Sequence, residues 1–243
     1  MGAGGGSADT APPTIAPQDE PPSYNLIAPY APPVTCPPSA PLDHAIVKGL
    51  PPGMELLLQV NQLIVKEKFS VSQGLGSSYD VLNHLGQRLL QTDQNIGCCC
   101  PVYDVSFRDN SGNDVLKLLE ARSCTCTPQI SVTCLSGAPV GFVKLHVNHL
   151  VTHLSVMDSS NKVILLILGP SLRDSIFGNS TFEVKSRDEQ HVVGIIKMET
   201  DHVLVSFPLD MEVAVKALLL GSSLFLSHLI KLARRNLRTR SNS

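Results

Sequence analysis

Apolar side chains recur at every second position over much of this chain, in short runs separated by polar segments. Clear examples are residues 102–107, 130–134 and 142–147, where Val, Ile, Leu and Phe alternate with polar residues. A period of two places successive side chains on opposite faces of an extended backbone. Each run therefore predicts a β-strand with one buried face.

Four polar segments rich in Asn, Asp, Ser and Gly separate these runs and predict turns, because such residues favour the backbone conformations that turns require. They lie at residues 83–86, 109–112, 158–161 and 187–190. No helical periodicity stands between the runs from Met54 to Pro208. Many short strands without intervening helices predict an all-β fold, either an antiparallel barrel or a sandwich.

The segment Val213–Leu232 shows a different pattern, because it is apolar on all sides. About 20 apolar residues of helix are long enough to cross a bilayer. Lys216 lies near the start of the segment, where its ammonium could reach the membrane surface. Alternatively, protein surrounds the helix, as it would if the helix filled the bore of a barrel of about 12 strands. The pattern alone leaves both interpretations open.

A basic tail, residues 233–243, follows this helix. Its cations favour the cytoplasmic side of a membrane or an anionic lipid surface, although a solvated tail without a partner has the same composition. A spanning helix would then place the preceding chain outside the cell, yet no secretory signal peptide is recognised, so a buried or peripheral helix fits better. The candidate membrane-surface residues are Lys231, Arg234, Arg235, Arg238 and Arg240.

Composition divides the chain of 243 residues into an arm and a folded part. Of its 18 prolines, 13 lie within residues 1–52, which predicts a disordered arm over residues 1–49 and a folded domain over 50–232. Within the arm, Pro21, Pro22 and Tyr24 form a P-P-x-Y motif. Such a motif can bind a WW domain as a polyproline II segment, or the arm can be a plain spacer.

The cysteines gather in two places, at Cys98, Cys99 and Cys100 and at Cys124 and Cys126. Neither group has the paired spacing of a zinc site, and adjacent cysteines do not readily form a disulfide with each other. Clustered thiols in a reducing compartment are candidates for S-acylation, which anchors a protein stably when two or more signals act together. Unmodified loop cysteines are the alternative.

No catalytic constellation stands out. The eight histidines are scattered, and neither G-x-S-x-G nor H-E-x-x-H occurs. The nearest approach to a metal cluster is His146, His149 and His153, but the three do not share one face of a strand. The sequence predicts a protein that is not an enzyme.

Several short motifs occur in an order that carries a family resemblance. They are Pro51 to Glu55, Asn83 with Gly86 to Arg88, Asp109 to Gly112, Pro139 to Val143, Phe182 to Ser186, Asp188 to Gln190 with Val192 to Gly194, and Phe207 to Asp210. Through these motifs the chain resembles the phospholipid scramblase family over residues 50–230.

The resemblance implies a tubby-like β-barrel around a hydrophobic C-terminal helix. It also implies ATP-independent, bidirectional movement of phospholipids between membrane leaflets at the cytoplasmic face of the plasma membrane. Further implied features are acylated cysteines and an N-terminal arm that binds WW or Src-homology-3 domains. The resemblance predicts no nucleic-acid partner.

The family's proposed calcium segment ends in F-P-L-D, and this ending aligns Glu199, Asp201 and Asp210 with its first, third and twelfth positions. The family has Gly where this chain has Leu204, and a tight calcium loop needs glycine for its sharp turn. Val203 and Val205 favour a strand instead. The three carboxylates are therefore candidate calcium ligands, but we expect calcium to bind weakly.

Two functional hypotheses follow. The first is a scramblase-like protein with doubtful calcium dependence. The second is a cytosolic lipid-binding or adaptor module, held at membranes by its basic tail and acylated cysteines and recruited through its WW-domain ligand. The environment of the helix at residues 213–232 distinguishes them best, because an enclosed helix offers lipid headgroups no path through the bilayer.

Overall fold

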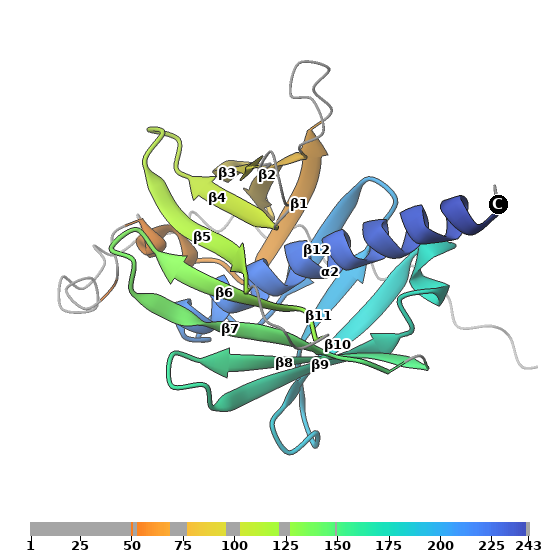
Figure 1. Ribbon diagram of the computed structural model, residues 1–243. Coiled ribbons are helices and arrows are strands. Elements are labelled where there is room, and N and C mark those ends of the chain that lie inside the picture. The colour runs from red at the N-terminus through yellow and green to blue at the C-terminus, as the bar shows by residue number, and fades with distance from the viewer. Residues whose placement is uncertain are drawn as a thin grey trace, which may run out of the picture. The chain divides into compact units, whose positions relative to one another are not determined.

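The computed structural model describes residues 50, 53–68, 77–95, 103–121, 127–148 and 150–241, with side chains as far as residue 239. These residues belong to one compact unit, Asp43–Ser243. They form a closed β-barrel of twelve strands around one long helix (Figure 1). The all-β class predicted from the alternating runs is confirmed, and so is the barrel around a C-terminal helix that the family resemblance implied.

All neighbouring strands of the barrel are antiparallel, and each pairs with the next strand along the chain. The barrel closes where β1 pairs on one side with β2, at Leu63 and Asn83, and on the other side with β12, at Leu63 and Val205. The strands are β1 (Gln62–Lys68), β2 (Ser78–Asn83), β3 (Arg88–Asn95), β4 (Asp104–Arg108), β5 (Asp114–Glu120), β6 (Gln129–Cys134), β7 (Pro139–His146), β8 (Val151–Asp158), β9 (Val163–Pro170), β10 (Ser180–Ser186), β11 (Val192–Met198) and β12 (His202–Ser206). Two short 3₁₀ helices, η1 (Met54–Leu57) and η3 (Asp174–Ile176), precede β1 and β10.

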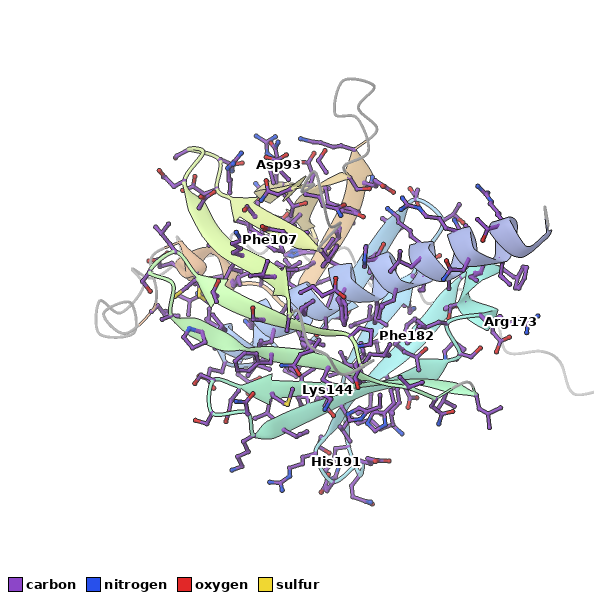
Figure 2. The ribbon with its side chains drawn as sticks, viewed as in Figure 1. Asp93, Phe107, Lys144, Arg173, Phe182 and His191 are labelled. Atoms are coloured by element: carbon purple, nitrogen blue, oxygen red, sulfur yellow. The ribbon has the colours of Figure 1, made fainter. Side chains whose placement is uncertain are left out.

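Alternation along each strand produces the core. In β6, for example, Ile130, Val132 and Cys134 are buried and point into the barrel, while the residues between them are partly exposed. Phe107 and Phe182 are fully buried within the barrel (Figure 2). The period-two pattern thus separates the inner from the outer face of the sheet.

The four predicted turns connect β2 to β3, β4 to β5, β8 to β9 and β10 to β11. Two of them use an aspartate in the same way. In the second turn, Oδ1 of Asp109 accepts hydrogen bonds from the backbone N–H groups of Ser111 and Asn113, each at 2.8 Å. In the third, Oδ1 of Asp158 accepts from Ser160 at 2.8 Å and from Lys162 at 2.9 Å. A short polar side chain that closes its own turn explains why these segments end the strands.

The helix α2 (Val213–Ser241) passes through the barrel and continues past the predicted end at Leu232. Most of the predicted basic tail is therefore part of this helix. We call the end of the barrel where α2 begins the helix-start end. The other end, where α2 leaves the barrel, is the helix-exit end (Figure 1). Strands reach the helix-exit end at Lys68, Asn95, Glu120, His146, Pro170 and Met198.

Candidate functional site

Helix α2 is the element that the sequence pattern could place either in a membrane or inside the protein. It is the one helix among the described residues that is long and apolar enough to cross a membrane. Within that span, 78% of the most apolar window is buried inside the barrel. The burial runs from Val213, which is 6% exposed, to Ile230, which is 7% exposed. The strands enclose the apolar part of the helix, and only its basic end projects.

Small residues allow this close fit between helix and sheet. A Cβ at Gly221 in α2 would lie 3.0 Å from Cδ2 of Leu118 and 3.2 Å from Cγ2 of Val132. The neighbouring hydroxyls of Ser222 and Ser223 are fully buried and donate to the helix's own carbonyl groups at 2.8 and 2.7 Å. These small and polar residues make the segment less hydrophobic than a typical membrane span. Inside the protein the two serine hydroxyls have hydrogen-bond partners.

Lys216 does not reach outward from the helix, as the membrane interpretation predicts, but is fully buried. Its ammonium donates hydrogen bonds to the backbone oxygens of Leu57 and Leu58, each at 3.1 Å, and of Leu209 at 2.8 Å. The Phe207 ring lies 5.6 Å from the same nitrogen. Burial lowers the pKa of Lys216, and the nearby Asp210 carboxylate opposes that shift. Three carbonyl groups match the three donors of an ammonium, so this lysine ties α2 to the segments around its start.

At the helix-exit end, a groove of about 550 Å³ lies between α2, β1 and the β11–β12 turn. In it, Nζ of Lys231 lies 2.5 Å from Oε1 of Glu67 and 2.8 Å from the hydroxyl of Tyr79. The next basic residue, Arg234, donates to the carbonyl oxygen of Ile176 in η3 at 3.2 Å. Two of the predicted membrane-surface residues thus also hold the helix against the barrel rim.

A second groove, of about 690 Å³, lies on the other side of η3. The β7–β8 connection contributes Val147 and the start of β8 contributes Val151. The segment around η3 contributes Arg173, and α2 contributes Ala233 and Leu237. Arg235 and Arg238 are exposed on the projecting part of the same helix. The backbone of Arg240 also belongs to this helix. The predicted basic residues therefore gather around the helix-exit end.

The three candidate calcium ligands lie at two ends of one strand. Glu199 and Asp201 belong to the turn between β11 and β12, whereas Asp210 lies beyond β12, in the link to α2. Oδ1 of Asp201 is 2.7 Å from Nδ1 of His202, and this hydrogen bond lowers the pKa of the aspartate. Within the described ranges, no group of three His, Cys, Asp or Glu side chains could hold a metal ion. Calcium binding itself stays a prediction.

Strand pairing brings together two histidines that spacing along the chain did not. His146 of β7 lies directly opposite His153 of β8, and their ring centroids are 4.5 Å apart. Nε2 of His146 is 2.7 Å from the hydroxyl of Ser155. Burial, with the charges of His153 and Lys144, lowers the pKa of His146. The sequence could have indicated this pair only through the β7–β8 hairpin. Its two strands are antiparallel, so residues seven positions apart in the chain lie opposite each other.

Several predicted sites lie outside the described residues. These are the WW-ligand residues Pro21, Pro22 and Tyr24, and the acylation candidates Cys98, Cys99, Cys100, Cys124 and Cys126. The described residues on either side of the two cysteine segments are Asn95 and Tyr103, and Ala121 and Thr127. Asn95 ends β3, and the other three lie within two residues of β4, β5 and β6, at the helix-exit end.

These features define a class of protein: a twelve-stranded β-barrel with an enclosed apolar helix and a cationic helix end. The Scramblase family model matches residues 40–228, and the chain belongs to this family.

Curated relatives agree with this assignment. Bovine phospholipid scramblase 2 (Bos taurus) is 29% identical, covering 71% of this chain and 69% of the relative. Phospholipid scramblase 1 of Mus musculus is 29% identical over 71% of this chain and 61% of its own length. Human phospholipid scramblase 1 (Homo sapiens) is 28% identical over 71% of this chain and 63% of its own length. The chain thus spans about two thirds of the length of these relatives.

Proposed function

We propose that this protein promotes ATP-independent, bidirectional movement of phospholipids between the two leaflets of a membrane. Membership of the Scramblase family carries this proposal, together with relatives that bear the name phospholipid scramblase. We place the protein at the cytoplasmic face of the plasma membrane. There its basic helix end would meet anionic lipid, since each lysine or arginine near such a surface contributes about 1 kcal/mol.

Lipid movement requires a path for a polar headgroup across about 30 Å of hydrocarbon. The folded barrel presents its apolar helix to its own strands, so a single folded chain offers no such path. Under our proposal the helix leaves the barrel, or several chains act together, when lipid moves. Release of the helix exposes apolar surface that the barrel normally buries, so we expect the intrinsic activity to be slow.

Attachment to the membrane would come from several weak signals. S-acylation of Cys98, Cys99, Cys100, Cys124 or Cys126 would add lipid chains, and the arm would recruit WW-domain or Src-homology-3 proteins through Pro21, Pro22 and Tyr24. One lipid chain binds a membrane only reversibly, so two or more signals are needed for stable attachment. The residues that flank the cysteines support this arrangement, because they lie at the same barrel end as the basic helix.

The enclosure of α2 favours a second candidate function, a lipid-binding or adaptor module that associates with membranes without moving lipid. In this case the helix serves as the core of the barrel and never leaves it. The second candidate predicts membrane binding without transfer of lipid between leaflets.

One experiment separates the two functions. Purified protein is reconstituted into liposomes that contain fluorescently labelled lipid, and dithionite then bleaches only the label that reaches the outer leaflet. We expect slow bleaching of inner-leaflet label, with or without calcium. Bleaching no faster than in protein-free liposomes, with normal vesicle binding, would favour the adaptor.

A zero-length carbodiimide crosslink tests whether the helix must leave. Lys231 and Glu67 form the one ion pair that joins α2 to the barrel strands among the described residues, at 2.5 Å. Their crosslink, made before reconstitution, should abolish scrambling if the helix moves. Glu67→Gln removes the carboxylate, so treated Glu67→Gln protein should keep its activity. Deleting residues 213–243 is not a useful test, because it removes the core of the barrel.

A further inference from the structure

Exposed apolar side chains stand around the point where α2 leaves the barrel. Leu150 is 82% exposed and Phe177 is 79% exposed, the two highest values among the large hydrophobic residues of the described chain. Val147 is 64% exposed and Val151 is 42% exposed beside them, and Leu232 of the helix is 38% exposed. Large apolar side chains are seldom exposed so completely in a group unless they meet a partner.

These side chains come from three segments that lie together. The segments are the β7–β8 connection, the residues around η3, and the projecting part of α2. The groove of about 690 Å³ joins all three, since Val147, Arg173 and Leu237 line it together. The hydrogen bond from Arg234 to the carbonyl oxygen of Ile176 fixes α2 against η3. The three segments therefore form one surface, which we call the helix-exit face.

The charge on the helix-exit face is mainly positive, although Glu67, Glu199 and Asp201 line the neighbouring groove beside Phe177. Arg173 is exposed beside η3, and Figure 2 shows it at the end of the barrel from which α2 projects. Arg234, Arg235 and Arg238 follow on the helix. Within residues 147–151, 171–178 and 231–241 the only acidic residue is Asp174, whose carboxylate accepts a hydrogen bond from the Ser171 hydroxyl at 2.7 Å. Exposed apolar tips with cations beside them suit the boundary between lipid headgroups and acyl chains.

The turns at the opposite end of the barrel are mainly acidic, although Lys162 and Arg187 also lie there. The carboxylates of Asp109, Asp158 and Asp188 close turns there. Hydrogen bonds, from Asn113 to Asp109 and from Ser186 to Asp188, lower the pKa of both carboxyl groups, so both are charged at neutral pH. An anionic membrane repels this end and attracts the helix-exit face, which gives the barrel a definite orientation.

We propose that the helix-exit face docks onto an anionic phospholipid bilayer, with Leu150 and Phe177 inserted among the acyl chains and the arginines on lipid phosphates. This inference rests on the proposed function in that it takes a bilayer as the target. It adds the surface that touches the bilayer and the direction in which the barrel stands. Docking brings the projecting end of α2, and not the turns of the helix-start end, to the membrane.

The chain contains no tryptophan, so one introduced indole reports on one place. When the Phe177→Trp variant binds vesicles containing phosphatidylserine, its tryptophan fluorescence should shift to shorter wavelengths. Lipids with brominated acyl chains should quench this fluorescence. The matched control is Leu85→Trp in the β2–β3 turn, where the wild-type side chain is 69% exposed at the other end. Its emission should not change. Equal responses of the two variants, or no response of Phe177→Trp on vesicles that bind the protein, would overturn the proposal.

Cosedimentation with vesicles measures how much the helix-exit face contributes to the affinity of the protein for membranes. The double variant Leu150→Ser, Phe177→Ser should bind vesicles at least about tenfold more weakly. It lacks the two large apolar side chains whose transfer from water into the bilayer favours binding. The control pair is Leu85→Ser and Leu135→Ser at the helix-start end, and it should bind like the wild type. Arg173→Glu should weaken binding to vesicles with phosphatidylserine, whereas Arg187→Glu in the β10–β11 turn should not.

These measurements record binding and not lipid movement, so they separate the two proposals. Normal docking without scrambling would contradict only the proposed function. Scrambling that is unaffected by the double Ser variant, with unchanged vesicle binding, would contradict the docking surface alone. Failure of the wild-type protein to bind vesicles with phosphatidylserine would also refute the surface and would point to a protein partner for it.

Discussion

The ammonium of Lys216 in the first turn of α2 hydrogen-bonds to the carbonyl oxygen of Leu57 in η1, a residue 159 positions earlier in the chain, at 3.1 Å. With its bonds to Leu58 and Leu209, this single side chain joins the segment before β1 to the segment after β12. The two strands are paired where the barrel closes. A buried lysine that has no carboxylate within hydrogen-bonding distance among the described residues thus helps to close the barrel around its helix.

Replacing this lysine should destabilise the fold. Lys216→Met keeps an unbranched side chain that is one atom shorter but leaves three buried carbonyl oxygens without their donor. Each unsatisfied group costs about 1–3 kcal/mol. Relief from the buried charge offsets part of that cost, so we expect a net loss of about 2 kcal/mol. Urea unfolding should show a lower midpoint with the same slope. Lys162→Met, at an exposed turn position, should have no effect; an equal midpoint for the two variants would contradict the role of Lys216.

The stability of the barrel should fall in mild acid because of His228. Burial, followed by the charges of Arg235 and Lys231, lowers the pKa of His228 to about 4, and its ring lies 4.2 Å from the ring of Tyr103. Between pH 6.5 and about 4 the unfolded chain takes up a proton that the folded chain does not. The free energy of unfolding therefore decreases as the pH falls through this window, by at most about 3 kcal/mol.

His228→Phe keeps an aromatic ring against Tyr103 and removes the titration. Thermal unfolding at a series of pH values should show a smaller loss of stability between pH 6.5 and about 4 in this variant than in the wild type. His84→Phe, in the exposed β2–β3 turn, should keep the wild-type dependence. A parallel pH dependence of His228→Phe and the wild type would show that this histidine does not carry the effect.

Calcium should bind with a dissociation constant weaker than about 1 mM, which corresponds to about −4 kcal/mol. The five residues of β12 lie between Asp201 and Asp210, and a strand of that length spans about 17 Å. Calcium needs its six to eight oxygen ligands at about 2.3–2.6 Å, so these carboxylates cannot share one ion in this fold. Titration calorimetry is the test. Micromolar affinity that disappears in Asp201→Ala would refute it.

The P-P-x-Y motif of the arm should bind WW domains. Tyr24→Ala removes the ring that fills the aromatic groove and should abolish binding to a panel of isolated WW domains, as measured by calorimetry. Tyr30→Ala, at another tyrosine of the arm, is the matched control and should bind normally. Neither change should alter the unfolding temperature. If the wild-type chain binds none of the domains more tightly than about 1 mM, the arm is a spacer.

Particular residues show how far sequence patterns reach. The strands and the four turns were predictable because side-chain alternation and turn chemistry act over only a few neighbouring residues. The strand preference of Val203 and Val205 correctly placed β12 between the candidate calcium ligands. The end of α2 was missed, because arginine is a good helix former and nothing in the tail breaks the helix after Leu232.

The sequence by itself determined the class of fold, the presence of one helix apolar on all sides, and the cluster of cations that follows it. Only the tertiary structure decided where that helix lies, because strands and lipid tails can both cover an apolar surface. It also decided the partners of Lys216, the pairing of His146 with His153, and the meeting of Leu150, Phe177 and the arginines at one end. These are contacts between residues far apart in the chain, and no local pattern records them.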